Sequence, residues 1–416
     1  MKIADGVYVH FIPTQKYKTN RIVFRMTGSL NKQTIAKRAL VSQMLATANQ
    51  TYPTVQSFKE RLASLYGTQL STRVSTKGLT HSVDIELTYL KDAFIPTNDG
   101  LFLEVLGFLK ECLYKPLSRV AQYQNKVFDI EKQNLKTYLD VDTENNYYYS
   151  EVKGRELYFV NEGLKVPKYG QVELVEAETS FTAYQEFQSM LTRDRIDIFM
   201  VGEFDDYQVL QALHRFPLEG RQVDLQFSYS QRYVNVVREK IEPRQSSQSI
   251  LQLGYQFQCQ YGDKDYFALI VFNAMFGEFA HSALFTTLRE KEGLAYSISS
   301  QFDIFTGLLE VYAGIEKSNR NQAMRGISRE LNYIKLGRFS SSLLNQTKKI
   351  IRMNALLSED HALTLVEQRF NKVIFGDKSL SLENWLDEIE KVTKKDVCRV
   401  ARQVKLQSLF FLEGVS

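Results

Sequence analysis

The sequence has few of the features that mark a secreted, membrane-spanning or disulfide-rich protein. Its 416 residues include three cysteines, Cys112, Cys259 and Cys398, which are scattered and odd in number. Such a set argues against a disulfide framework and suits a reducing compartment. No stretch of about 18 apolar residues occurs, so no membrane span is expected. The opening MKIADGVYVHFIP lacks the basic and then apolar run of a signal peptide, and we therefore expect a cytoplasmic location.

Neither positive nor negative residues are in large excess. The chain has 52 basic and 48 acidic residues, and its formal net charge is +4. This balance predicts a mixed, solvated surface and not a nucleic-acid-binding face. Because 44% of the residues are apolar, the chain can bury the cores of two or three domains.

The order of predicted helices and strands repeats along the chain. When the second half is shifted back by 226 positions, Gly293 falls on Gly67 and Val311 falls on Ile85. Helical patterns followed by alternating strand patterns then coincide, although few residues are identical. We therefore predict an α+β fold of two homologous halves, each a mainly antiparallel sheet flanked by helices.

A polar stretch without a core period separates these halves. Residues 218–248 contain Gly220, Pro243 and the run RQSSQS, which favours a linker over a packed element. The predicted domains are therefore residues 1–217 and residues 249–416, with the linker over 218–248 between them.

The most informative stretch is LFTTLREKEGLAYSIS, residues 284–299. A helical pattern over 280–291 ends at Gly293, which suits the left-handed position that closes a helix, and an alternating run from Ala295 predicts a strand. A helix that reverses into a strand can bring Arg289 and Tyr296 over one surface. There a guanidinium and a phenol can hold a peptide carbonyl or a carboxylate. The alternative is that Arg289 caps its helix and Tyr296 packs.

This stretch also carries a family resemblance. The run LREKEGLAYSISS resembles the C-terminal signature of the insulinase/pitrilysin family of zinc peptidases, and MFGEFAHSALFTTL resembles the turn and helix that precede it there. In that family an Arg and a Tyr with this spacing hold the substrate backbone, which implies substrate-binding roles for Arg289 and Tyr296. The resemblance also implies two homologous halves packed as a clamshell.

The metal-binding motif of that family is absent at the matching place. Active members carry H-x-x-E-H on the first long helix, where both histidines bind zinc and the glutamate is the general base. In the matching run ALVSQMLATANQ, Ala39, Ser42 and Gln43 occupy those positions. Alanine has no ligand atom, neutral glutamine is a poor zinc ligand, and serine cannot replace a carboxylate base.

No other histidines restore the site. No two of the five lie within five positions of each other, so no helical pair exists; they are His10, His81, His214, His281 and His361. The run FDIEKQNLKTYLD resembles the stretch that holds the distal zinc ligand in the family. Our alignment places Asn134 at that position, with Glu131 nearby.

Two weaker candidates have structural explanations. His281 lies beside Ser282 with no partnering acid, and we interpret it as structural or as lining a substrate groove. Glu359, Asp360 and His361 begin a helical pattern, where acids favour the positive end of the helix dipole. The sequence has no Walker loop, no dinucleotide glycine fingerprint and no cysteine pair at metal spacing.

These observations favour the non-catalytic subunit of a bacterial two-chain peptidase. In two-chain members of the family one chain supplies the metal and the other can supply the Arg and Tyr. The resemblance thus implies a homologous zinc-bearing partner, a peptide substrate, and neither a catalytic residue nor a cofactor in this chain. The alternative from another class is a peptide- or protein-binding scaffold with no part in proteolysis. A stand-alone peptidase is disfavoured by the missing ligands, and a homodimer of the isolated chain stays open.

Overall fold

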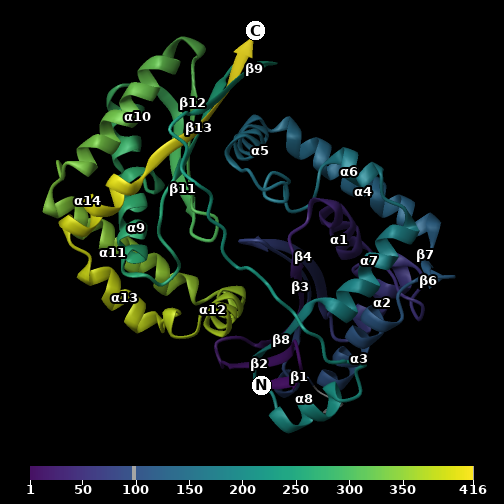
Figure 1. The fold of residues 1–416 in the computed structure, drawn as a ribbon. Helices are drawn as coiled ribbons and strands as arrows, with labels where there is room; N and C mark the ends of the chain where they lie inside the picture. Colours follow the sequence, from purple (N-terminus) through teal and green to yellow (C-terminus); the bar gives the residue numbers. More distant parts are fainter. Residues whose placement is uncertain (96–99, 416) are drawn as a thin grey trace. The chain divides into compact units, whose positions relative to one another are not determined.

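Two β-sheets, one in each of two units, form the framework of the protein (Figure 1). The computed structural model describes residues 1–95 and 100–415. Unit 1 comprises Met1–Val141, Val166–Gln226 and Asp360–Arg369. Unit 2 comprises Asp142–Lys165, Phe227–Glu359 and the residues from Phe370 onward. Each unit therefore includes a helical segment that the chain order alone would assign to the other.

Unit 1 is built on a six-stranded sheet of order β1-β2-β8-β3-β5-β4. Its strands are β1 (Lys2–Ala4), β2 (Val7–Pro13), β3 (Thr19–Ser29), β4 (Gln69–Lys77), β5 (Thr80–Leu90) and β8 (Arg195–Gly202), and a separate hairpin pairs β6 (Ser118–Arg119) with β7 (Gln122–Tyr123). The helices are α1 (Lys32–Leu45), α2 (Val55–Ser64), α3 (Leu101–Tyr114), α4 (Asn125–Glu144), α6 (Val172–Glu176), α7 (Ser180–Arg193), α8 (Asp206–Leu213) and the short η1 (Asp92–Phe94).

The sequence explains why these elements form. Asn31 accepts a hydrogen bond from the backbone of Gln33 and starts α1, while Thr54 and Thr179 form capping boxes at α2 and α7. In β3, alternate residues such as Phe24 point into the core beneath the helices. Their neighbours along the strand, including Arg25, point to the opposite side of the sheet. We call the side of each sheet that faces away from its main helical core the second face.

Unit 2 is built on a five-stranded sheet of order β11-β12-β10-β13-β9. Its strands are β9 (Arg238–Gln245), β10 (Ser249–Gln256), β11 (Ala295–Asp303), β12 (Leu308–Ile315) and β13 (Lys405–Val415). The helices are α5 (Asn146–Tyr158), α9 (Lys264–Asn273), η2 (Ala274–Glu278), η3 (Phe285–Lys291), η4 (Lys317–Asn319), α10 (Arg320–Lys335), α11 (Ser341–Ser358), α12 (Ala362–Phe375, which begins in unit 1), η5 (Gly376–Lys378), α13 (Leu382–Lys391) and α14 (Lys394–Gln403). Figure 1 shows α9, α10 and α14 on one side of this sheet and α5 on the other.

The two sheets repeat one connectivity, as the sequence predicted. The order β2-β8-β3-β5-β4 in unit 1 matches β9-β13-β10-β12-β11 in unit 2. In both, the first pair is parallel and the remaining pairs are antiparallel. The α+β fold with two similar sheets is confirmed. The stretch 218–248 differs from the expectation of a plain linker, because β9 lies within it and pairs with β13.

Within the described ranges, every helix is too short or too polar to cross a membrane.

Candidate functional site

The helix that carries Arg289 has an unusual geometry. The helical pattern over 280–291 forms a π-helix over Phe285–Lys291. The N–H of Glu292 donates to the carbonyl of Thr287 at 2.9 Å, and the N–H of Leu294 donates to that of Leu288 at 2.8 Å. Gly293 closes the helix with φ +61°, a left-handed conformation that favours glycine. Such wide turns are rare and recur at functional sites.

Arg289 lies on the solvent side of this helix. The opposite side is anchored by Leu284 and Leu288, which are fully buried, and Gly326 of α10 lies close to Leu288. The Arg289 guanidinium lies 4.7 Å from the ring centroid of Phe285, one turn earlier. Within the described part of the chain, no hydrogen bond or ion pair engages it. A stacked guanidinium with unused donors is well placed to bind an acceptor.

Tyr296 occupies a β-bulge at the start of the edge strand β11. Ala295 pairs with Ile315 and Ser297 with Gly314, so Tyr296 is the extra residue. Bulges of this kind redirect a side chain and recur beside active sites. The Tyr296 side chain is 52% exposed and its phenol donates a hydrogen bond to Glu316 Oε1 at 2.7 Å. This bond raises the pKa of the phenol, which keeps Tyr296 protonated as a donor.

The two predicted binding residues therefore have separate partners. Arg289 stacks on Phe285, and Tyr296 donates to Glu316. Among residues 1–95 and 100–415, no hydrogen bond, ion pair or ring contact joins them. The prediction that both hold one peptide stays a prediction, and the structure adds Glu316 as a residue that sequence reasoning missed.

The helix that would carry a zinc motif offers no ligand set. In α1, Ala39 and Ser42 are buried, and the Ser42 hydroxyl donates to the Ala39 carbonyl at 2.8 Å. Gln43 is half-buried, and its carbonyl accepts from Thr47. No group of three histidine, cysteine, aspartate or glutamate side chains able to hold a metal occurs in the part of the chain that the structure describes. These residues do not fit a zinc ion.

In the region aligned with the distal zinc ligand, the carboxylate of Glu131 accepts hydrogen bonds from nearby side chains. Glu131 of α4 is buried, and its Oε1 accepts from Thr47 Oγ1 at 3.0 Å. Its Oε2 accepts from the Asn134 amide at 3.2 Å. Thr47 follows α1 one turn after Gln43, so this carboxylate connects α1 and α4 through hydrogen bonds instead of completing a metal shell.

The remaining histidine candidates have structural surroundings. His281 shares a hydrogen bond with Thr347 of α11 at 2.9 Å, and burial lowers the pKa of its imidazole. His361 precedes α12, and its carbonyl accepts from Thr364. Nothing in these contacts gives either histidine a partnering acid.

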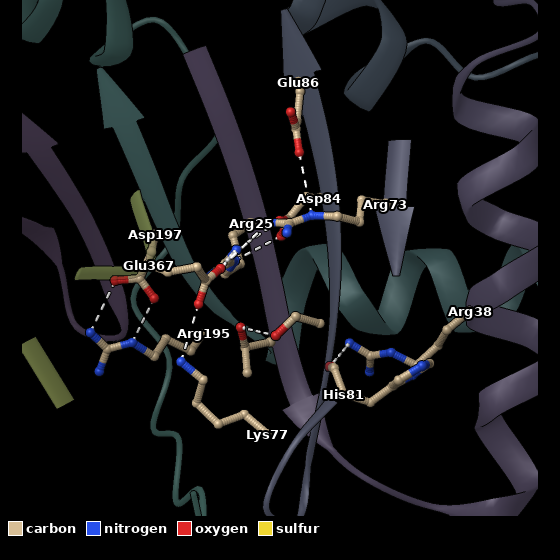
Figure 2. Close-up of polar contacts among 12 residues, drawn as sticks. Arg25, Arg38, Arg73, Lys77, His81, Asp84, Glu86, Arg195, Asp197 and Glu367 are labelled. Carbon is tan, nitrogen blue, oxygen red and sulfur yellow. Dashed lines mark hydrogen bonds and ion pairs between the residues drawn. The ribbon is translucent and has the colours of Figure 1, made fainter. Parts of the chain in front are cut away.

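A network of charges on the second face of the unit 1 sheet was missed at the sequence level (Figure 2). Strands β3, β5 and β4 bring Arg25, Asp84 and Arg73 side by side, and Glu367 of α12 joins them. A signal existed, because charged residues alternate with apolar ones in RIVFRMT and SVDIELT. Alternation places such charges on one face, but the sequence does not reveal which strands pair.

Comparisons with known proteins agree on one family. Residues 184–351 match the family model described as "Peptidase M16 inactive domain". The chain is 30% identical over 416 residues to the "Probable inactive metalloprotease YmfF" of Bacillus subtilis, covering 98% of this chain and 96% of that protein.

Two solved structures share the fold of this chain. A crystal structure of a conserved protein from Enterococcus faecalis has a TM-score of 0.97 at 36% identity, covering 100% of this chain and 98% of that one. The peptidase M16 inactive domain from Pseudomonas fluorescens has a TM-score of 0.77 at 15% identity, covering 99% and 97%. At that low identity the second likeness concerns the fold alone.

Proposed function

The chain belongs to the M16 (insulinase/pitrilysin) family of peptidases as an inactive homologue, and on that premise we propose that it is the peptide-holding subunit of a two-chain peptidase. A homologous partner chain supplies the zinc, and this chain contributes Arg289 and Tyr296. One observation carries the proposal: α1 has no metal ligands, whereas the helix and strand of the Arg–Tyr motif are intact and exposed.

The contacts of the motif give each residue a role. Arg289 has unused N–H donors held over Phe285, so it can bind a backbone carbonyl without first breaking a hydrogen bond. Tyr296 must release Glu316 before its phenol can donate to a peptide. Beside them, β11 is an edge strand without a charged side chain or proline before Asp303. Such an edge can accept an extended peptide as an added strand.

The three cysteines Cys112, Cys259 and Cys398 are unpaired with one another. This agrees with the reducing, cytoplasmic location that we propose for the complex.

The proposal is tested with the chain and a zinc-bearing homologue from the same genome. The purified chain should contain no stoichiometric zinc by elemental analysis and should cleave no peptide alone. With the partner, Arg289→Ala should lower peptide turnover about ten- to a hundredfold, because a hydrogen bond from a charged group contributes roughly 1.5–3 kcal/mol.

The matched control is Lys291→Ala, which removes an exposed cation two residues further along the same helix. It should leave turnover unchanged, and both variants should co-purify with the partner. Stoichiometric zinc in the isolated chain, or equal turnover of R289A and wild type, would refute the proposal. Capture of an unrelated partner with no peptidase motif would favour the scaffold alternative.

A further inference from the structure

The charges on the second face of the unit 1 sheet are positioned by the strands themselves. Asp84 of β5 is the cross-strand neighbour of Arg25 on one side and Arg73 on the other. Arg25 donates to both oxygens of Asp84, at 2.8 Å each, and Arg73 Nη2 donates to Oδ2 at 2.8 Å. Contacts between strands alone therefore hold both guanidinium groups in position.

The strand-borne part of this network has more cations than acids. Arg21, Arg25, Arg73 and Lys77 stand against Asp84 and Glu86, an excess of two positive charges. Asp197 of β8 lies beside Arg25 but is bound at both oxygens by Arg195, at 2.7 and 3.0 Å. Arg25 and Lys77 are largely buried, at 1% and 14% exposed, and cations removed from water need an anion, so this face favours a further negative group.

Glu367 provides that group from α12 (Figure 2). Its Oε1 accepts from Arg25 Nη2 at 2.6 Å and from Arg73 Nη2 at 3.4 Å, and its Oε2 accepts from Lys77 Nζ at 3.1 Å. Two guanidiniums at one oxygen and an ammonium at the other match a planar carboxylate.

The position of Glu367 is also reachable. The side chains of Glu367 and Arg73 are 34% and 32% exposed. Arg73 and Lys77 lie on the edge strand β4, where an added strand would place its side chains beside theirs. At the other end of the network, Arg21 lines a cavity of about 360 Å³ together with Tyr17 and His361.

We propose that Arg25, Arg73 and Lys77 form a carboxylate-binding site in which Glu367 is an internal ligand, and that an acidic side chain of an extended peptide can replace it. The strands hold the N–H donors of Arg25, Arg73 and Lys77 in position, and the Glu367 carboxylate occupies the acceptor position between them. All of these residues belong to unit 1, whereas Arg289 and Tyr296 belong to unit 2.

The first test removes the internal ligand. Glu367→Ala should melt at a lower temperature than wild type in sodium chloride, and sodium acetate at equal ionic strength should raise its Tm by roughly 2 °C. The control is Glu176→Ala, which removes an exposed carboxylate that contacts Lys136 at 2.6 Å in the same unit. Because acetate stabilises folded proteins in general more than chloride does, the Tm rise of E367A in acetate should exceed the rises of this control and of wild type. A rise for E367A that is no larger than those of wild type and E176A would overturn the proposal.

The second test identifies the source of the carboxylate. Calorimetric titration of E367A should show binding of the blocked peptide Ac-GSEGS-NH2 and at least tenfold weaker binding of Ac-GSQGS-NH2. Binding of a free C-terminal carboxylate alone, seen with Ac-GSQGS-OH only, would overturn the assignment to a side chain. If E367A does not fold in either salt, wild type is used: the Glu peptide should speed amide exchange of residues 362–369 relative to the Gln peptide, and equal exchange would refute replacement of Glu367.

Discussion

The second faces of the two sheets are closed by different physical means, although the sheets share one connectivity. In unit 2, α5 lies so close to the sheet that glycine is needed on both sides. A Cβ on Gly154 of the helix would lie 2.6 Å from Gln252 Cγ, and one on Gly254 of the sheet would lie 3.0 Å from Tyr158 Cδ2. Around these contacts an apolar cluster forms from Ile250, Phe410, Leu412, Tyr147, Tyr149 and Leu157.

Unit 1 has a cluster of charges at this face, whereas unit 2 combines close packing with an ion pair. In unit 1 the helix contributes an acid, Glu367, and the sheet contributes the bases. In unit 2 the order is reversed, since Arg155 of α5 donates to Glu310 of β12 at 3.0 and 2.7 Å. The shared connectivity of the two sheets thus leaves the chemistry of their second faces free to differ. The stability of unit 2 should therefore respond to added volume at this face as well as to loss of its ion pair, and the stability of unit 1 should respond to pH.

The largest effect is expected from Arg155→Ala. Among the described residues, the variant leaves the buried Glu310 carboxylate two hydrogen-bond donors, the amides of Gln252 and Gln301, each at 3.3 Å. We expect a loss of about 2 kcal/mol, below the range for breaking a fully buried pair, because those amides remain and the Arg155 side chain is 39% exposed. Trp385, the one tryptophan in the sequence, packs against the unit 2 core, so its fluorescence measures urea unfolding of that unit.

The control for this prediction is Arg399→Ala. It breaks the more exposed pair with Asp265 in the same unit and should cost less than about 1 kcal/mol. If both variants shifted the Trp385 unfolding transition equally, the Arg155–Glu310 pair would stabilise unit 2 no more than an exposed ion pair does.

Replacing glycines in helices should change the free energy of unfolding by a smaller amount, and the sign of the change should depend on the surroundings of each glycine. Gly154→Ala should destabilise by about 1–2 kcal/mol because the new methyl group meets Gln252. Gly107→Ala in α3 should instead stabilise by about 0.5–1 kcal/mol, since a Cβ there meets no atom within 4 Å and alanine favours a helix. Urea midpoints followed by Trp385 for G154A and by circular dichroism for G107A test this. Stabilisation by G154A would show that α5 packs loosely.

The repeated framework was predictable because alternation is a local property. The offset of 226 places β4 (Gln69–Lys77) on β11 (Ala295–Asp303), and both form as edge strands. The loss of metal ligands at Ala39, Ser42 and Gln43 could also be read directly, since residue type decides whether a ligand atom exists.

The assignment of α5 and α12 to their units was not predictable. The sequence around the tyrosines of α5 and around Glu367 of α12 does not reveal their partners, because those partners lie far away along the chain. Glu367 contacts Arg25, 342 residues earlier, and Arg155 contacts Glu310, 155 residues later. The bulge at Tyr296 was hidden for a related reason, because an extra residue is visible only when the register of the paired strand is known.

The smallest effect, and the sharpest separation of the two units, is expected from Glu367→Gln as a function of pH. Burial alone would raise the pKa of Glu367, but Arg25 and then Lys77 lower it from the usual 4.5 to about 2. A carboxyl whose pKa falls on folding stabilises the fold above its unfolded pKa and loses that contribution as pH drops through its folded pKa. Wild type should therefore exceed E367Q by about 1 kcal/mol above pH 4.5, because the pair is partly exposed, and the difference should close toward pH 2.

Circular dichroism follows both units, whereas Trp385 follows unit 2 alone, so the pH-dependent difference should appear in the first signal and not in the second. A difference that persists unchanged to pH 2 would mean that the charge of Glu367 does not stabilise unit 1. The packing of the Glu367 side chain would then stabilise unit 1 more than its charge does, and the proposed difference between the second faces of the two sheets would be wrong.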